Sequence, residues 1–99
     1  MPAKARPLRR DVFLEEVRFW QKRLKVAPKR VQVQAMRHKW ASCSTAGRVC
    51  FNRELLAQAP GFRRTVVVHE LLHLRVPNHG KLFRTLMNAL VPGWEKQLR

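Results

Sequence analysis

The sequence predicts a small α+β domain in which helices pack on a small antiparallel sheet. Three observations support this class. The chain has 99 residues, which suits one domain. Apolar residues recur at helical spacing near both ends, and a segment of alternating polarity lies between them. The expected order of elements is α-β-β-α-α-α, with a basic flexible tail at residues 1–9 and the domain at 10–99.

The first predicted helix covers residues 11–24. Its apolar side chains Phe13, Val17, Trp20 and Leu24 fall on one face, because they follow a period of about 3.6 residues. This face is expected to pack on the core.

Two strands are expected next, at residues 30–36 and 48–51. The first alternates apolar and polar residues, and the second follows a turn at Thr45–Gly47. The two strands are predicted to form an antiparallel pair.

Three helices complete the predicted order, with a short tail helix after Pro92-Gly93. A short helix starts after Asn52 and stops at Pro60-Gly61, and a buried helix then runs from Phe62 until Pro77 disfavours helix at Val76. The next helix, residues 79–90, places Leu82, Leu86 and Leu90 on one face. The buried helix is expected at the centre of the domain.

The charge is strongly positive, with 21 Lys and Arg against 6 Asp and Glu. Two interpretations stay open: a basic surface that keeps a small protein soluble, or contact with an anionic partner such as nucleic acid. No apolar run approaches the roughly 20 residues of a membrane span, and the basic, proline-broken start is unlike a secretory signal. We therefore expect a cytoplasmic protein with Cys43 and Cys50 reduced.

One motif carries specific chemistry: His69, Glu70 and His73 form H-E-x-x-H. Residues four apart share a helix face, so the two imidazoles can bind one zinc ion. Glu70 can act as general base on the metal-bound water.

A catalytic zinc site needs a third protein ligand and one open position. Pro77-Asn78 breaks the helix, and His79 follows directly. The break lets His79 fold back toward the same ion. The expected site is therefore one zinc held by His69, His73 and His79, although buried core histidines remain the alternative.

A group that stabilises the oxyanion is also expected, because zinc peptidases often use a Tyr or a second His for this task. The chain has no Tyr. Arg37, His38 or a backbone N–H is the candidate substrate or oxyanion group.

The chain resembles the bacterial YgjP-like metallopeptidase domains, also described as M48-family or DUF45-like proteins and related to the SprT-like and WLM zincins. The segments "FLEEVRFWQKRLKVAPKRVQVQAMRHKWASCSTAGRVCFNRELL" and "TVVVHELLHLRVPNHGKLF" carry the resemblance, which covers nearly all of residues 10–94. It implies a minimal zincin-like fold, zinc on His69, His73 and His79, and Glu70 as general base. Ala41 and Gly80 depart from the family's usual Gly and Ser.

The leading hypothesis is a zinc-dependent hydrolase, specifically a metallopeptidase that acts on a peptide or protein. Two alternatives stay open. One is a metal-dependent nucleotide or phosphoanhydride hydrolase. The other is a basic nucleic-acid-binding module with a structural zinc, which would need a fourth ligand such as His38, Cys43 or Cys50.

Overall fold

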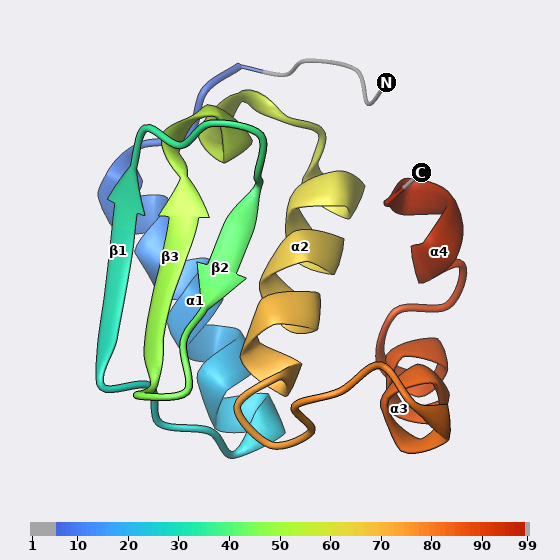
Figure 1. Cartoon of the computed structure of the whole chain (residues 1–99). Coiled ribbons are helices and arrows are strands. Elements are labelled where there is room, and N and C mark those ends of the chain that lie inside the picture. The colour runs from blue at the N-terminus through green and yellow to red at the C-terminus, as the bar shows by residue number, and fades with distance from the viewer. Residues whose placement is uncertain (1–5, 99) are drawn as a thin grey trace.

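A computed structural model describes residues 6–98 of the chain. In order, the elements are helix α1 (Arg10–Leu24), strands β1 (Arg30–Gln34), β2 (Ala41–Cys43) and β3 (Arg48–Asn52), the 3-10 helix η1 (Arg53–Ala57), and helices α2 (Pro60–Leu72), α3 (Lys81–Leu90) and α4 (Trp94–Gln97) (Figure 1). The α+β class is confirmed, with one more strand than predicted. The first five residues of the expected tail lie outside the described residues, and the Leu8 N–H donates to the Leu56 carbonyl at 2.9 Å.

The sheet is mixed, so the predicted antiparallel pairing of the first and last strands was wrong. The strand order is β1-β3-β2. β1 runs parallel to β3, with Arg30 opposite Arg48, whereas β2 pairs antiparallel with β3, with Ser42 opposite Cys50. Alternating polarity fixes which face a strand buries and leaves its direction open. The three residues of β2 were too few to establish a strand from their alternation.

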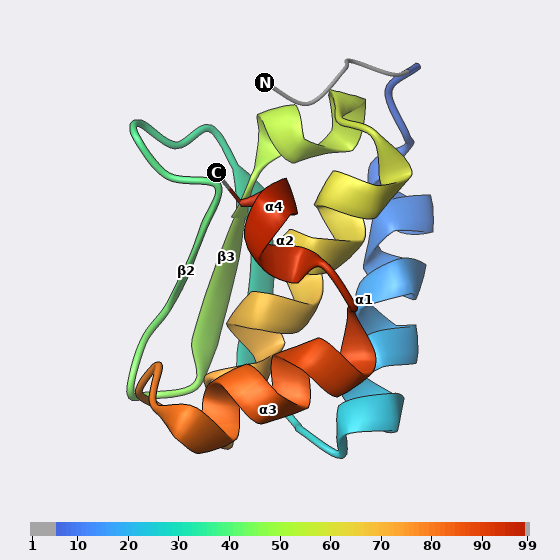
Figure 2. The same ribbon diagram turned by 90° about the vertical axis from the view of Figure 1, so that its right-hand side faces the viewer.

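The helices α1 and α2 cover the same face of the sheet (Figure 2). Phe51 of β3 packs edge-on against Phe13 of α1, with ring centroids 5.4 Å apart. The expected burial of α2 is confirmed, because Val67, Val68 and Leu71 are almost completely shielded from solvent. Among the described helices, none is long and apolar enough to cross a membrane.

Two details of the helices differ from the prediction. Pro60 begins α2 instead of ending the element before it, since a proline at the first helical position loses no hydrogen bond. In α3 the buried side chains are Phe83 and Met87, and Leu82 is 60% exposed. Helical spacing allowed either neighbouring stripe of this helix to face inward, and packing against α2 selected the stripe with Phe83.

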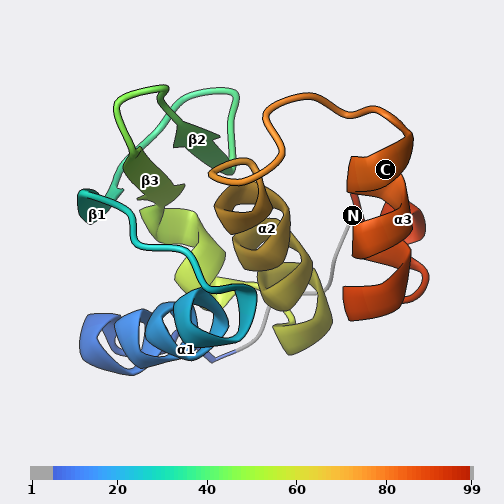
Figure 3. The same cartoon turned by 90° about the horizontal axis from the view of Figure 1, so that it is seen from below.

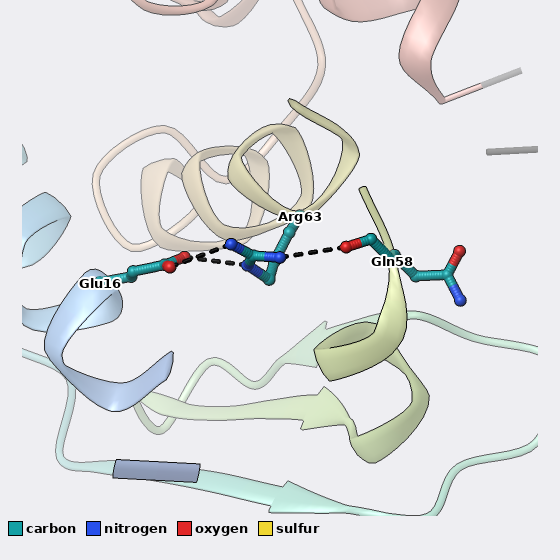
Figure 4. A network of polar contacts seen from close by, with 3 residues as sticks. All are labelled: Glu16, Gln58 and Arg63. Atoms are coloured by element: carbon teal, nitrogen blue, oxygen red, sulfur yellow. Dashed lines mark hydrogen bonds and ion pairs between the residues drawn. The ribbon is translucent and has the colours of Figure 1, made fainter. Parts of the chain in front are cut away.

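A buried arginine joins α1 to the start of α2 (Figure 4). The guanidinium of Arg63 donates from Nε and Nη2 to the two carboxylate oxygens of Glu16, at 3.0 and 3.1 Å, and from Nη1 to the Gln58 carbonyl at 3.0 Å. Each of its three nitrogens therefore has a partner, in a place where an unpaired charge would be costly.

Arg63→Ala is expected to lower the free energy of unfolding by about 2 to 3 kcal/mol, because three charge-assisted hydrogen bonds are lost and the Gln58 carbonyl loses its donor. Urea denaturation measures the change. Arg64→Ala is the matched control, since the neighbouring Arg64 is exposed and its loss should change stability by less than about 0.5 kcal/mol. Equal effects of both substitutions would contradict the role of the network.

Candidate metal centre

The carboxyl-terminal half of α2 carries His69 and Glu70, and His73 caps its end. The rings of His69 and His73 lie beside each other, with centroids 4.9 Å apart. The opposite side of the helix holds Val68 and Leu71, both fully buried. Burial of that side fixes the rotation of α2, so the histidines lie on the side of the helix that faces α3 and the cleft.

The chain turns back immediately after α2. The helix α2 ends at Leu72, four residues earlier than predicted, and residues 73–75 continue as a turn. The Val76 N–H donates to the Leu72 carbonyl at 2.9 Å and closes this turn just before Pro77. His79 then lies with its Nε2 only 2.9 Å from Nε2 of His73. One ligand nitrogen from each of His69, His73 and His79 lies within 4.8 Å of the others. The structure thus brings together the three histidines predicted as metal ligands.

The surroundings of the three rings fit a metal ion. Nδ1 of His73 lies 3.2 Å from the Val76 carbonyl, and a proton on Nδ1 would leave Nε2 free to bind metal. The pKa of His79 is lowered, mainly by partial desolvation and to a lesser extent by the neighbouring His73 and His69. The neutral imidazole is the form that coordinates metal. Nitrogen donors of this kind and number suit zinc.

Phe83 of α3 supports all three histidines from beneath. Its fully buried ring stacks on His73 at a centroid distance of 4.7 Å and meets His69 and His79 edge-on at 5.1 and 4.9 Å. These contacts limit the rotation of each imidazole. Sequence reasoning missed this residue, because it expected the stripe of Leu82, Leu86 and Leu90 to face inward.

Glu70 lies beside the histidines and faces the sheet. Its side chain is 14% exposed, with Oε2 3.5 Å from Nδ1 of His69. Burial, and to a lesser extent the Glu70 carboxylate, raise the pKa of the Cys43 thiol in β2. The carboxylate is therefore close enough to act electrostatically across the space between α2 and β2.

That space is a cleft of about 880 Å³ between the edge strand and the metal-centre helix, which lie side by side in Figure 1. The three histidines and Glu70 form one wall, and Ala41, Ser42 and Cys43 form the other. The remaining lining residues are Lys39, Trp40, Ser44, Thr45, Val66, Leu74, Pro77 and Leu98. The cleft is open enough for a chain to lie along it.

The predicted oxyanion candidates lie just before the cleft wall. Arg37 and His38 are exposed, and the lining includes their neighbour Lys39 in their place. His38 has a backbone φ of 60°, an uncommon value for a residue other than glycine. The buried side chain of Asn52 holds this turn, because its Nδ2 donates to the carbonyls of Met36 and Lys39 at 3.3 and 2.8 Å.

Comparisons with known proteins agree with this geometry. The family profile described as "YgjP-like, metallopeptidase domain" matches residues 5–99. No protein in a search of curated sequences matches the chain.

Two crystal structures of metallopeptidase zymogens share the fold. Jannalysin of Methanocaldococcus jannaschii is 20% identical with a TM-score of 0.70, over 78% of this chain and 79% of that chain. Abylysin of Pyrococcus abyssi is 16% identical with a TM-score of 0.74, over 86% of this chain and 87% of that chain. At this identity the likeness concerns the fold.

Proposed function

The chain belongs to the YgjP-like metallopeptidase domain family, and from this premise we propose that it cleaves peptide bonds with one zinc ion held by His69, His73 and His79. Membership in the family makes it a hydrolase of the metallopeptidase class. The observation that carries the proposal is the set of three histidine nitrogens within 4.8 Å of one another, beside a glutamate in an open cleft.

The protein's own residues divide the work of the reaction. A zinc ion at this position would polarise the substrate carbonyl and acidify water. Glu70 accepts the proton of the attacking water and passes it to the leaving amine. The Phe83 ring and the Val76 carbonyl keep the histidines oriented, so that little reorganisation accompanies the reaction.

The edge strand β2 gives the substrate a place to bind. Ser44 donates to Arg48, and Trp40 accepts from Asn52, so the backbone groups of even-numbered residues in this stretch point toward β3. In an antiparallel ladder the groups of Ala41 and Cys43 therefore point to the open edge. We propose that an extended peptide pairs with these two residues, and that its scissile bond then lies opposite Glu70.

Cys43→Pro is expected to raise KM for peptides about tenfold, because proline removes a donor from the open edge and leaves the bonds of Ser42 and Ser44 to β3 in place. Cys43→Ala is the control that keeps the N–H, and its KM should stay near the wild-type value. Steady-state kinetics with a fluorogenic peptide measures both. A Cys43→Ala variant as impaired as Cys43→Pro would show that the side chain matters and the backbone pairing does not.

The turn before β2 is the proposed source of the oxyanion donor. This turn carries two exposed cations, Arg37 and Lys39, and the exposed imidazole of His38. The side chain of Asn52 fixes the turn next to the cleft. Alanine substitution of the residue that donates should lower kcat about 100-fold with little change in KM. Measuring the three single variants identifies the donor. Wild-type kcat in all three would exclude side-chain donation from this turn.

A further inference from the structure

The positive charge of this protein is distributed unevenly along the chain. Between Glu16 and Glu54 the sequence contains no Asp or Glu and ten Lys or Arg residues. All ten are exposed: Arg18, Lys22, Arg23, Lys25, Lys29, Arg30, Arg37, Lys39, Arg48 and Arg53. Such a stretch produces a region of positive potential with no internal compensation.

The fold gathers part of this charge at one end of the molecule. Lys29 donates its N–H to the Gly47 carbonyl at 2.8 Å, next to the register pair Arg30 and Arg48. From the other side, Arg75 after α2 donates to the Leu24 carbonyl at 3.1 Å, beside Lys25. We call the set Lys25, Lys29, Arg30, Arg48 and Arg75 the basic end. Figure 3 is seen from this end, with the α1–β1 connection, the β2–β3 turn and the loop after α2 near the viewer.

The carboxylates at the start of α1 and in η1 lie away from the basic end, and Glu70 lines the metal-centre cleft. Among the described residues, Arg9 pairs with Asp11 and Arg63 with Glu16, and no cation of the basic end forms an ion pair. The Leu8–Leu56 hydrogen bond places the start of α1, with its acids, near η1 and Glu54, while Arg30 and Arg48 lie at the other ends of their strands. Like charges directly opposite in a sheet are destabilising, so the Arg30–Arg48 pair costs stability in the free protein.

We propose that the basic end binds the sugar-phosphate backbone of a nucleic acid. Its cations come from both layers of the domain: Arg30 and Arg48 from neighbouring strands about 4.8 Å apart, and Lys25 and Arg75 from the ends of the helices. Charges spread in this way contact several phosphates of a polymer better than one small anion. Double-stranded DNA presents a negative charge about every 1.7 Å of its axis.

An anionic membrane fits this surface less well than a nucleic acid. Peripheral membrane binding usually combines basic residues with apolar side chains that enter the bilayer. The large exposed apolar side chains of the described residues are Val12, Phe19 and Leu82, and they belong to α1 and α3 instead of the connections that form the basic end.

The test compares two variants with the same net charge. Lys29→Gln, Arg30→Gln and Arg48→Gln are combined to neutralise the basic end, and Arg53→Gln, Arg64→Gln and Lys96→Gln are combined as a control with exposed cations elsewhere. Binding of a fluorescent 24-base-pair DNA is measured by anisotropy between 50 and 200 mM salt. The basic-end variant should bind at least about tenfold more weakly, and its slope of log K against log salt should fall by about 2 to 3.

The control variant should keep most of the affinity and of the salt slope. Equal losses in the two variants would show that only net charge matters and would overturn the proposal. Anionic vesicles or polyglutamate that bind the wild-type protein as tightly as DNA, at equal charge concentration, would also overturn it. Thermal melting should show the basic-end variant to be at least as stable as wild type, since the Arg30–Arg48 repulsion is removed. The test is independent of peptidase activity, because Glu70→Gln should bind DNA as wild type does.

Discussion

Glu70→Gln is expected to bind one zinc ion per chain and to lose about 10³-fold in kcat for peptide hydrolysis. Glutamine keeps the shape of the side chain, which lies beside His69 with 14% exposure, but it cannot accept a proton from water. Removing a positioned general base typically costs 10²- to 10⁴-fold. Metal analysis of the purified variant and stopped-assay kinetics give the two quantities separately.

The matched control for this substitution is Glu95→Gln, an exposed glutamate in α4, which should leave kcat unchanged. Nucleoside triphosphates should be assayed beside peptides, because a phosphoanhydride substrate would require the same base. Peptide turnover at the wild-type rate in Glu70→Gln would rule out Glu70 as the base. Loss of zinc from the variant would instead assign Glu70 a part in metal binding.

His73→Ala is expected to abolish tight zinc binding, because it removes one of the three proposed ligands. The ring of His73 lies 4.5 Å from that of His79 and 4.9 Å from that of His69. For the wild-type protein, zinc at 100 times its Kd should add about 2.7 kcal/mol to the free energy of unfolding. In a domain of 99 residues this corresponds to a rise of about 10 to 20 °C in Tm. The variant should show almost no rise.

His38→Ala provides the control, since His38 is the histidine outside the cluster. It removes one imidazole without touching the metal centre, so the zinc-dependent rise in Tm should match that of wild type. A metal-free wild-type protein whose Tm does not respond to zinc would contradict the proposed site. A response that disappears in His38→Ala and persists in His73→Ala would place the metal elsewhere.

Local sequence rules explain why the candidate site was predictable. The resemblance to the YgjP-like family, now shown by the match over residues 5–99, was itself carried by short motifs. Residues four apart meet on a helix whatever surrounds it, so His69 and His73 were certain to be neighbours once α2 formed. Pro77 disfavours the helical conformation at Val76, although α2 already ends at Leu72. The position of His79 after that break followed from the same local chemistry.

The direction of the first strand was not predictable in this way. Val31 and Val33 predict which face of β1 is buried. They do not predict whether β1 pairs parallel or antiparallel with β3, because both pairings bury the same side chains. The missing information was β2, whose three residues are too few to predict a strand from their pattern. Pairing with β3 alone makes them a strand.

The sequence by itself determined where the main helices form, the three histidines that lie together and the glutamate beside them, because each depends on residues within about ten positions of one another. The tertiary structure decided the rest: the open strand edge opposite Glu70, the Phe83 ring beneath the histidines and the gathering of Lys29, Arg30 and Arg48 with Arg75. These features join segments far apart in the chain. The free energy that stabilises these features comes from packing between elements. A local sequence pattern does not specify which elements pack together.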